Sequence, residues 1–92
     1  MIPNRVRITS KVSYEIVYQD IIQNDPDCMG LCDPNKHIIF IQIGLSKKQL
    51  YKTFIHELTH AWNFEFELGI SHESIYLLED AILKTLTLNK WV

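Results

Sequence analysis

The hydrophobic pattern changes at Ser46, where the chain reads SKKQLYKTFIHELTHAWNFEFELG over residues 46–69. Ser46 is a suitable N-cap, and the apolar residues after it recur at helical spacing until Gly69, a residue typical of helix ends. The positions on this stripe are Leu50, Phe54, Leu58, Ala61 and Leu68. The stretch therefore predicts one amphipathic helix, and the chain on either side of it follows different patterns.

Before this helix the apolar residues alternate with polar ones, as in strands with one buried face. The alternating positions are Val6, Ile8, Val12, Tyr14, Ile16 and Tyr18, with a hairpin expected around Thr9 to Lys11. A polar loop at 23–27 is followed by an apolar run at 29–32, a turn at 33–36 and a second run at 37–43. We expect about four strands, antiparallel because each turn between them is short.

After Gly69 a second helix is expected, with Ser71 as its cap and an end near Leu88. Its apolar stripe comprises Ile75, Leu78, Ile82 and Leu86. Strands followed by helices predict an α+β fold, with the two helices antiparallel. Ninety-two residues are enough for one small domain, covering residues 1–92, whose limited core makes any bound metal important to stability.

Composition narrows the choice of partners and of cell compartment. Nine Lys and Arg against eleven Asp and Glu give a net charge of −2, which argues against a nucleic-acid partner because phosphates require a basic surface. The longest apolar run, at 38–41, is far below the roughly 20 residues that span a membrane, and no apolar segment follows the basic N-terminus. We expect a cytoplasmic protein without membrane contact, in which Cys28 and Cys32 stay reduced.

The predicted first helix carries the sequence His56-Glu57-Leu58-Thr59-His60, an H-E-x-x-H motif. Residues four apart on a helix point the same way, so His56 and His60 can bind one metal ion, with Glu57 beside them. Neutral imidazoles bind Zn2+, which lowers the pKa of a bound water, and a nearby carboxylate can then take the proton of that water. The motif predicts metal-assisted hydrolysis with Glu57 as the general base; two surface histidines are the simpler alternative.

A zinc site needs a third protein ligand, and the downstream candidates are His72, Glu73, Glu79 and Asp80. If the helices form a hairpin around residues 69–71, Glu79 lies level with His60, whereas His72 and Glu73 stay near the turn. Glu79 also falls within the apolar stripe, where a carboxylate needs a partner. We therefore expect Glu79 to complete the site and His72 and Glu73 to be solvated, with Asp80 paired to Lys84.

The spacing from the motif to Glu79 resembles that of the gluzincins. More narrowly, the chain resembles small phage and mobile-element members of the ImmA/IrrE family of zinc peptidase-like proteins. The resemblance rests on the segments at 29–33, 37–41, 54–61 and 79–81. It implies a minimal peptidase core with His56, His60 and Glu79 as zinc ligands and Glu57 as base, in some members directed at a regulatory protein. The chain departs from the family by lacking an appended helix-turn-helix or sensor domain.

Two functions follow, and a third is weaker. The first is a zinc-dependent peptidase acting on a protein or peptide substrate, and the second is a binding module in which zinc only stabilises the fold. A protease of the SprT-like group, which works at DNA, is disfavoured by the acidic charge balance. For substrate contact, the strand at 37–43 is a possible edge but is better explained as core, and Tyr76 and His72 are the nearest possible oxyanion donors.

Overall fold

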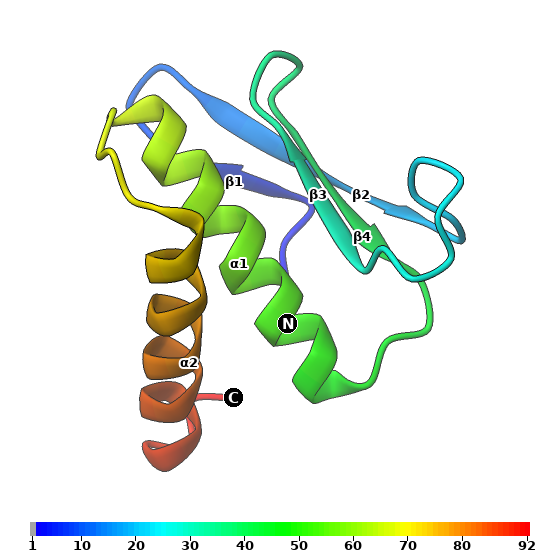
Figure 1. Ribbon diagram of the computed structural model, residues 1–92, viewed down its shortest axis with the longest axis vertical. Helices are drawn as coiled ribbons and strands as arrows, with labels where there is room; N and C mark the ends of the chain where they lie inside the picture. The colour runs from blue at the N-terminus through cyan, green and yellow to red at the C-terminus, as the bar shows by residue number, and fades with distance from the viewer. Residues whose placement is uncertain (1) are drawn as a thin grey trace.

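The computed structural model describes residues 2–92, which form a four-stranded sheet followed by two helices (Figure 1). The strands are β1 (Arg5–Arg7), β2 (Ser13–Gln19), β3 (Gly30–Asp33) and β4 (Ile38–Gln42). The helices are α1 (Lys47–Glu65) and α2 (His72–Leu88). The α+β prediction is confirmed. In the described residues, neither helix is long and apolar enough to cross a membrane.

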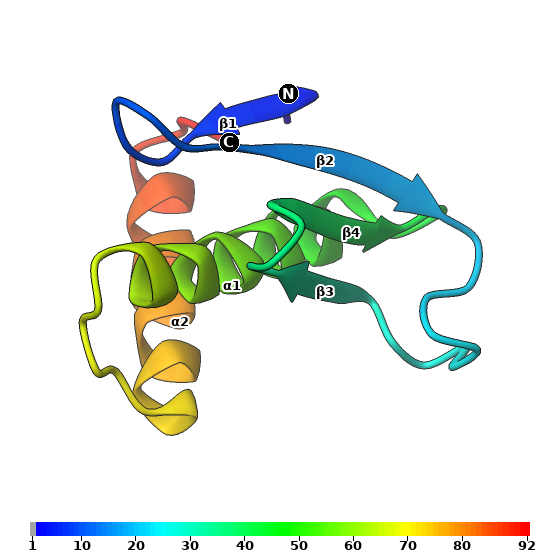
Figure 2. The same cartoon turned by 90° about the horizontal axis from the view of Figure 1, so that it is seen from above.

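The sheet is mixed, with strand order β1-β2-β4-β3. The pairs β1–β2 and β3–β4 are antiparallel, but β2 and β4 are parallel, with Ile16 opposite Ile39. The expectation of a wholly antiparallel sheet is wrong, because β3 takes the outer position and β4 returns beside β2 in the same direction (Figure 2). The strand predicted at 37–43 is β4, which lies inside the sheet and forms part of the core, as expected. The edge strand near the helices is β3.

The core lies between the central strands and α1. Tyr14, Ile39 and Ile41 are fully buried on the sheet, and Ala61 of α1 packs against them. Each large apolar side chain buried in this way contributes about 1.5–3 kcal/mol. The packing holds α1 against β4 and β3, so the residues on the remaining faces of α1 have a rigid support.

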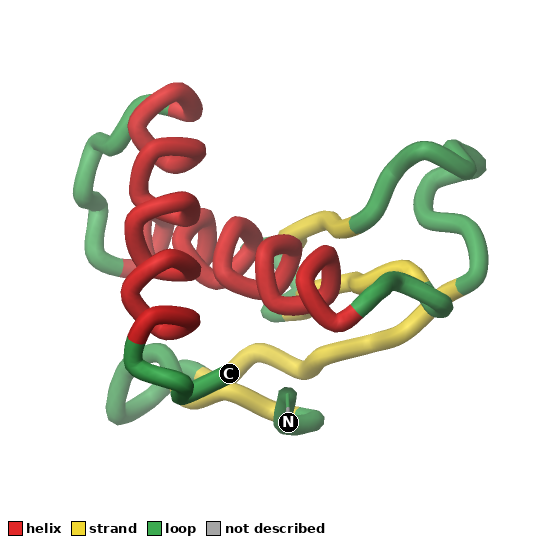
Figure 3. Tube along the Cα trace, turned by 90° about the horizontal axis from the view of Figure 1, so that it is seen from below, coloured by secondary structure: helices red, strands yellow, loops and turns green. Residues whose placement is uncertain are grey.

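The second helix lies on the side of α1 that is away from the sheet. It folds back across α1 (Figure 1), and the views from above and below show a steep crossing (Figures 2 and 3). Within residues 2–92, α2 packs against α1 and against no other helix or strand. Both predicted caps form: the Ser46 side chain accepts a hydrogen bond from the Gln49 backbone N–H, and that of Ser71 from the Ser74 N–H.

Asn63 determines where the second helix begins. Its side-chain amide donates to the carbonyl of Ile70 at 3.0 Å and accepts from the N–H of Ile70 at 2.9 Å. These two bonds tie the end of the connection to the last part of α1, one turn after His60. The start of α2 is therefore held beside the H-E-x-x-H motif.

Candidate metal centre

The two motif histidines lie on one face of α1, as their spacing requires. The Nε2 atoms of His56 and His60 are 3.2 Å apart. Both residues are partly buried, and α1 continues without a break through both positions. The rigid helix thus presents two imidazole nitrogens at one point.

His72, at the first position of α2, brings a third imidazole to the same point. Its Nε2 lies 3.3 Å from that of His56, and the ligand atoms of His56, His60 and His72 all lie within 4.8 Å of one another. Tetrahedral zinc with Zn–N bonds of 2.0–2.1 Å places its ligand nitrogens about 3.3 Å apart. The three side chains therefore fit a metal ion.

Glu79, the third ligand predicted from the sequence, lies on the other side of the His56 ring. Its Oε2 is 3.1 Å from Nδ1 of His56, and the residue is 2% exposed. Glu79 is therefore buried beside the motif, as its place in the apolar stripe predicted. The nitrogen that it contacts is not the one that faces His60 and His72, and metal-binding histidines commonly hydrogen-bond a carboxylate in this way.

A simple hairpin of the two helices would leave His72 too far from the motif to join it. The two helices instead cross steeply (Figure 2), and both His72 and Glu79 of α2 contact His56. The Asn63 contacts with Ile70 draw the start of α2 toward this crossing. Asn63 was not predicted from the sequence, because no periodicity or motif distinguishes this residue from other polar residues of the helix.

The electrostatics of the cluster favour metal binding. Burial lowers the pKa of both His56 and His60, and the charges of neighbouring groups lower them further: His72 and Lys52 for His56, and His56 and His72 for His60. Both imidazoles are therefore neutral near pH 7, with lone pairs available for a metal. Burial also raises the pKa of the Glu79 carboxyl.

Glu57 is buried at 7% exposure, between α1 and the edge strand. Burial and the charge of Glu79 raise the pKa of its carboxyl to about 7, although a hydrogen bond with the Cys32 backbone opposes this shift. A carboxylate with this pKa can both take and return a proton at neutral pH. The position and the protonation both suit the role of base that the motif predicts.

Gly30 explains how the edge strand can pass so close to Glu57. A Cβ atom at this position would lie 2.5 Å from Cγ2 of Thr53 and 3.1 Å from Cγ of Glu57. Only a glycine leaves room for this approach. Gly30 belongs to the segment that carried the family resemblance, but its part in shaping the site follows only from the fold.

Two open cavities meet at the motif. One, of about 830 Å³, is lined by all three histidines, Glu57, Glu79 and Tyr76. The other, of about 810 Å³, shares Leu31, Glu57 and His60 with the first and continues toward the end of α1. Together they form a cleft along α1 and β3. The ring of Tyr76 lies 4.9 Å from that of His56, on the rim.

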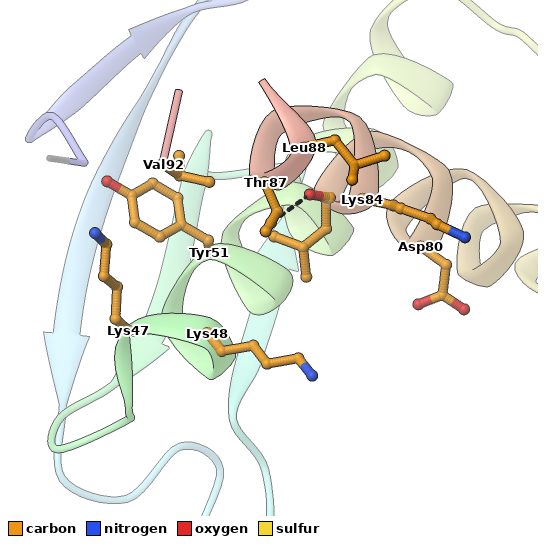
Figure 4. A pocket seen from close by; sticks show the side chains of 9 residues that line it. Lys47, Lys48, Tyr51, Asp80, Lys84, Thr87, Leu88 and Val92 are labelled. Carbon is orange, nitrogen blue, oxygen red and sulfur yellow. Dashed lines mark hydrogen bonds between the residues drawn. The ribbon is translucent and has the colours of Figure 1, made fainter. Parts of the chain in front are cut away.

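A further cavity, of about 620 Å³, lies away from the histidines (Figure 4). The start of α1 and the end of α2 form it, with Lys47, Lys84 and Leu88 among its lining residues. It contains Asp80 but none of the residues of the histidine cluster. Of the described residues that line it, Lys48 alone also lines the cavity at the histidines, so the two cavities are neighbours that meet at this side chain.

The remaining sequence candidates lie outside the cluster. Glu73 is exposed in the first turn of α2. Asp80 is exposed and pairs with Lys52 of α1 at 3.8 Å, not with Lys84 as expected, because the crossing brings the two helices together there. Cys28 and Cys32 are both free, and burial raises the pKa of the Cys32 thiol to about 12.

Comparison of the chain with protein-family models, with curated proteins and with solved structures gives no match.

Proposed function

We propose that the protein is a zinc-dependent peptidase that hydrolyses a protein or peptide substrate. The observation that carries the proposal is the convergence of three Nε2 atoms, with separations of 3.2 and 3.3 Å from His56, in a cleft that also contains the Glu57 carboxyl. Three protein ligands with an open fourth position are typical of catalytic zinc sites. We include in this proposal the activity that the resemblance to the ImmA/IrrE family implies, which is peptidase action on a regulatory protein.

In this proposal His56, His60 and His72 bind the metal. Zinc held there supplies a Lewis acid that lowers the pKa of water to about 7 and polarises a carbonyl group. Glu57 accepts the proton of the attacking water and passes it to the leaving amine, which a carboxyl with a pKa of about 7 can do. Glu79 holds the His56 ring through Nδ1 and so orients Nε2 toward the metal.

The choice of third ligand is tested by metal analysis of three zinc-loaded forms: the wild type, His72→Ala and Glu79→Gln. We expect one zinc per chain in the wild type, loss of stoichiometric zinc in His72→Ala, and a zinc affinity lowered by about 10- to 100-fold in Glu79→Gln. Full zinc affinity in His72→Ala together with complete loss in Glu79→Gln would make Glu79 the ligand, as the sequence alone predicted.

The reaction is tested with Glu57→Gln. This variant keeps all three histidines, so we expect it to bind one zinc per chain but to hydrolyse a casein or mixed-peptide substrate at least about 100-fold more slowly than the wild type. Retained hydrolysis in the zinc-loaded variant would remove Glu57 from the mechanism.

One observation favours the binding module as a second function. Within residues 2–92, α2 contacts only α1, so a metal that joins His72 to His56 and His60 would hold α2 in place. Zinc that stabilises the protein without any hydrolysis of peptides would support this function over the peptidase.

A further inference from the structure

The cleft at the histidine cluster has opposite charges at its two ends. Beyond His56, toward the start of α1, the cavity lining includes Lys48 and Lys52. Beyond His60, toward the end of α1, the lining of the second cavity includes Glu65 and Glu67, and none of the described residues that line it is a lysine or an arginine. The histidines lie between a cationic half and an acidic half.

One charge in each half has no ion-pair partner among residues 2–92. Lys52 pairs with Asp80, and Glu65 accepts a hydrogen bond from Tyr14 at 2.6 Å and lies 3.7 Å from His37. Lys48 and Glu67 are exposed, and the described part of the chain, 2–92, offers neither of them an ion pair. These two side chains are therefore available to a bound molecule.

Lys48 and Glu67 both lie at ends of α1 where their charges are unfavourable for the helix dipole. The first turn of α1 contains Lys47 and Lys48 and no acid, its last turn contains no base, and Glu67 follows its C-cap. Helix dipoles favour acids at the start and bases at the end, by about 0.3–1 kcal/mol for each charge. Local features that work against stability are expected mainly at functional sites.

The edge strand gives the cleft a direction. β3 pairs with β4 on one side only, and its residues line first the cationic cavity, at Gly30, and then the acidic one, at Cys32. An extended peptide can add to such an edge, and antiparallel pairing is the more stable arrangement. A peptide running opposite to β3 would place its N-terminal half near Glu67 and its C-terminal half near Lys48.

From this geometry, and resting on the proposed peptidase function, we infer that the substrate is a peptide segment with a basic residue on the N-terminal side of the cleaved bond and an acidic residue on the C-terminal side. Lys48 and Glu67 are the specificity-determining residues.

The test uses three quenched fluorescent peptides with the same apolar centre. One carries Lys on the N-terminal side and Glu on the C-terminal side, the second has these charges exchanged, and the third is neutral. With the zinc-loaded wild type at low salt, we expect kcat/KM for the first peptide to exceed that of the second by about tenfold, since each exposed ion pair supplies roughly two- to fivefold. High salt should reduce the difference.

Charge reversal at the two residues gives the sharpest comparison. In Lys48→Glu combined with Glu67→Lys, the preference between the first two peptides should invert. Lys47→Glu is the matched control, because it makes the same change one residue away at a position that lines neither half of the cleft. It should keep the wild-type preference. Lys48→Glu alone should leave Tm unchanged or raise it, because an acidic residue is favourable in the first turn of a helix. A loss of the preference for the first peptide in this variant therefore cannot be due to unfolding.

Binding of the same peptides to zinc-loaded Glu57→Gln, followed by fluorescence anisotropy, separates the two proposals. Preferential binding of the first peptide without any hydrolysis in the wild type would support the charged cleft and refute the peptidase. Hydrolysis of all three peptides at equal rates, or a preference for the exchanged peptide, would overturn the charged cleft while the peptidase stands.

Discussion

The helix α1 has two buried sides that differ in kind. Toward the central strands, Ala61 packs on Ile39 and Ile41, and this contact is apolar. Toward α2 and the edge strand, the buried residues include Glu57 and Glu79, beside partly buried histidines. The first side stabilises the fold by removing apolar surface from water, whereas the second carries titratable groups whose burial costs free energy unless they are paired. The fold and the site therefore respond to different changes.

The largest expected effect is on the apolar side. Ile39→Ala should lower the free energy of unfolding by about 2–5 kcal/mol, because it leaves a cavity in the core. The cost should be the same with and without zinc, since Ile39 lies on the sheet. Urea unfolding of both forms measures it. A cost that disappears on adding zinc would mean that the two sides are not independent.

Chelation should act on the other side. Removing zinc present at 100 times its dissociation constant should lower the free energy of unfolding by about 2.7 kcal/mol. Hydrogen exchange should then speed up in α2 before it does so in β2 and β4, because α1 is the one helix or strand of the described chain that α2 packs against. Equal acceleration in the sheet and in α2 would contradict the division of the molecule into an apolar and a titratable side.

Glu57→Gln tests the electrostatic cost of the site in the metal-free protein. In the folded protein the pKa of the Glu57 carboxyl is about 7, above its ordinary value of 4.5. The stability that the protonated carboxyl contributes is therefore fully present below pH 4.5 and is lost as the pH rises through 7. The stability of the neutral variant relative to the wild type should therefore increase with pH, by about 2.5 kcal/mol between pH 5 and pH 8. Thermal melts at the two pH values measure this. A difference independent of pH would assign the effect to packing.

The smallest effect is expected at Asn63. Asn63→Ala removes two hydrogen bonds to Ile70 and should cost about 1 kcal/mol of stability. The substitution should also weaken zinc binding, because the start of α2, with His72, is no longer held beside His60. Isothermal titration with zinc measures the affinity. Asn89→Ala, which removes a bond at the other end of α2, is the matched control and should leave zinc affinity unchanged.

The sequence predicted the helices and the strands better than their arrangement. Periodicity located both helices with their caps at Ser46 and Ser71, alternation located β1 and β2, and short apolar runs located β3 and β4. The parallel pairing of β2 with β4 was missed, because the short turns around β3 suggested a simple meander, and strand order depends on contacts between distant residues.

The candidate site shows the same division. His56, Glu57 and His60 follow from spacing on one helix, which is a local property. The contribution of His72 depends on a crossing between two helices, and the closeness of Gly30 to Glu57 depends on which strand occupies the edge. Both are properties of the assembled fold, so composition and periodicity contain no direct signal for them.

The close approach at Gly30 has a mechanical consequence. Because β3 packs directly on Thr53 and Glu57, the strand and α1 are held together by this contact. His72 belongs to a second body, α2, joined to the first through residues 66–71. A hinge opening at this connection would withdraw His72 from the other two histidines, together with Tyr76 and Glu79, and leave the base and the part of the cleft wall formed by α1 and β3 in place. Such an opening would release the metal while the side of the cleft formed by α1 and β3 keeps its shape.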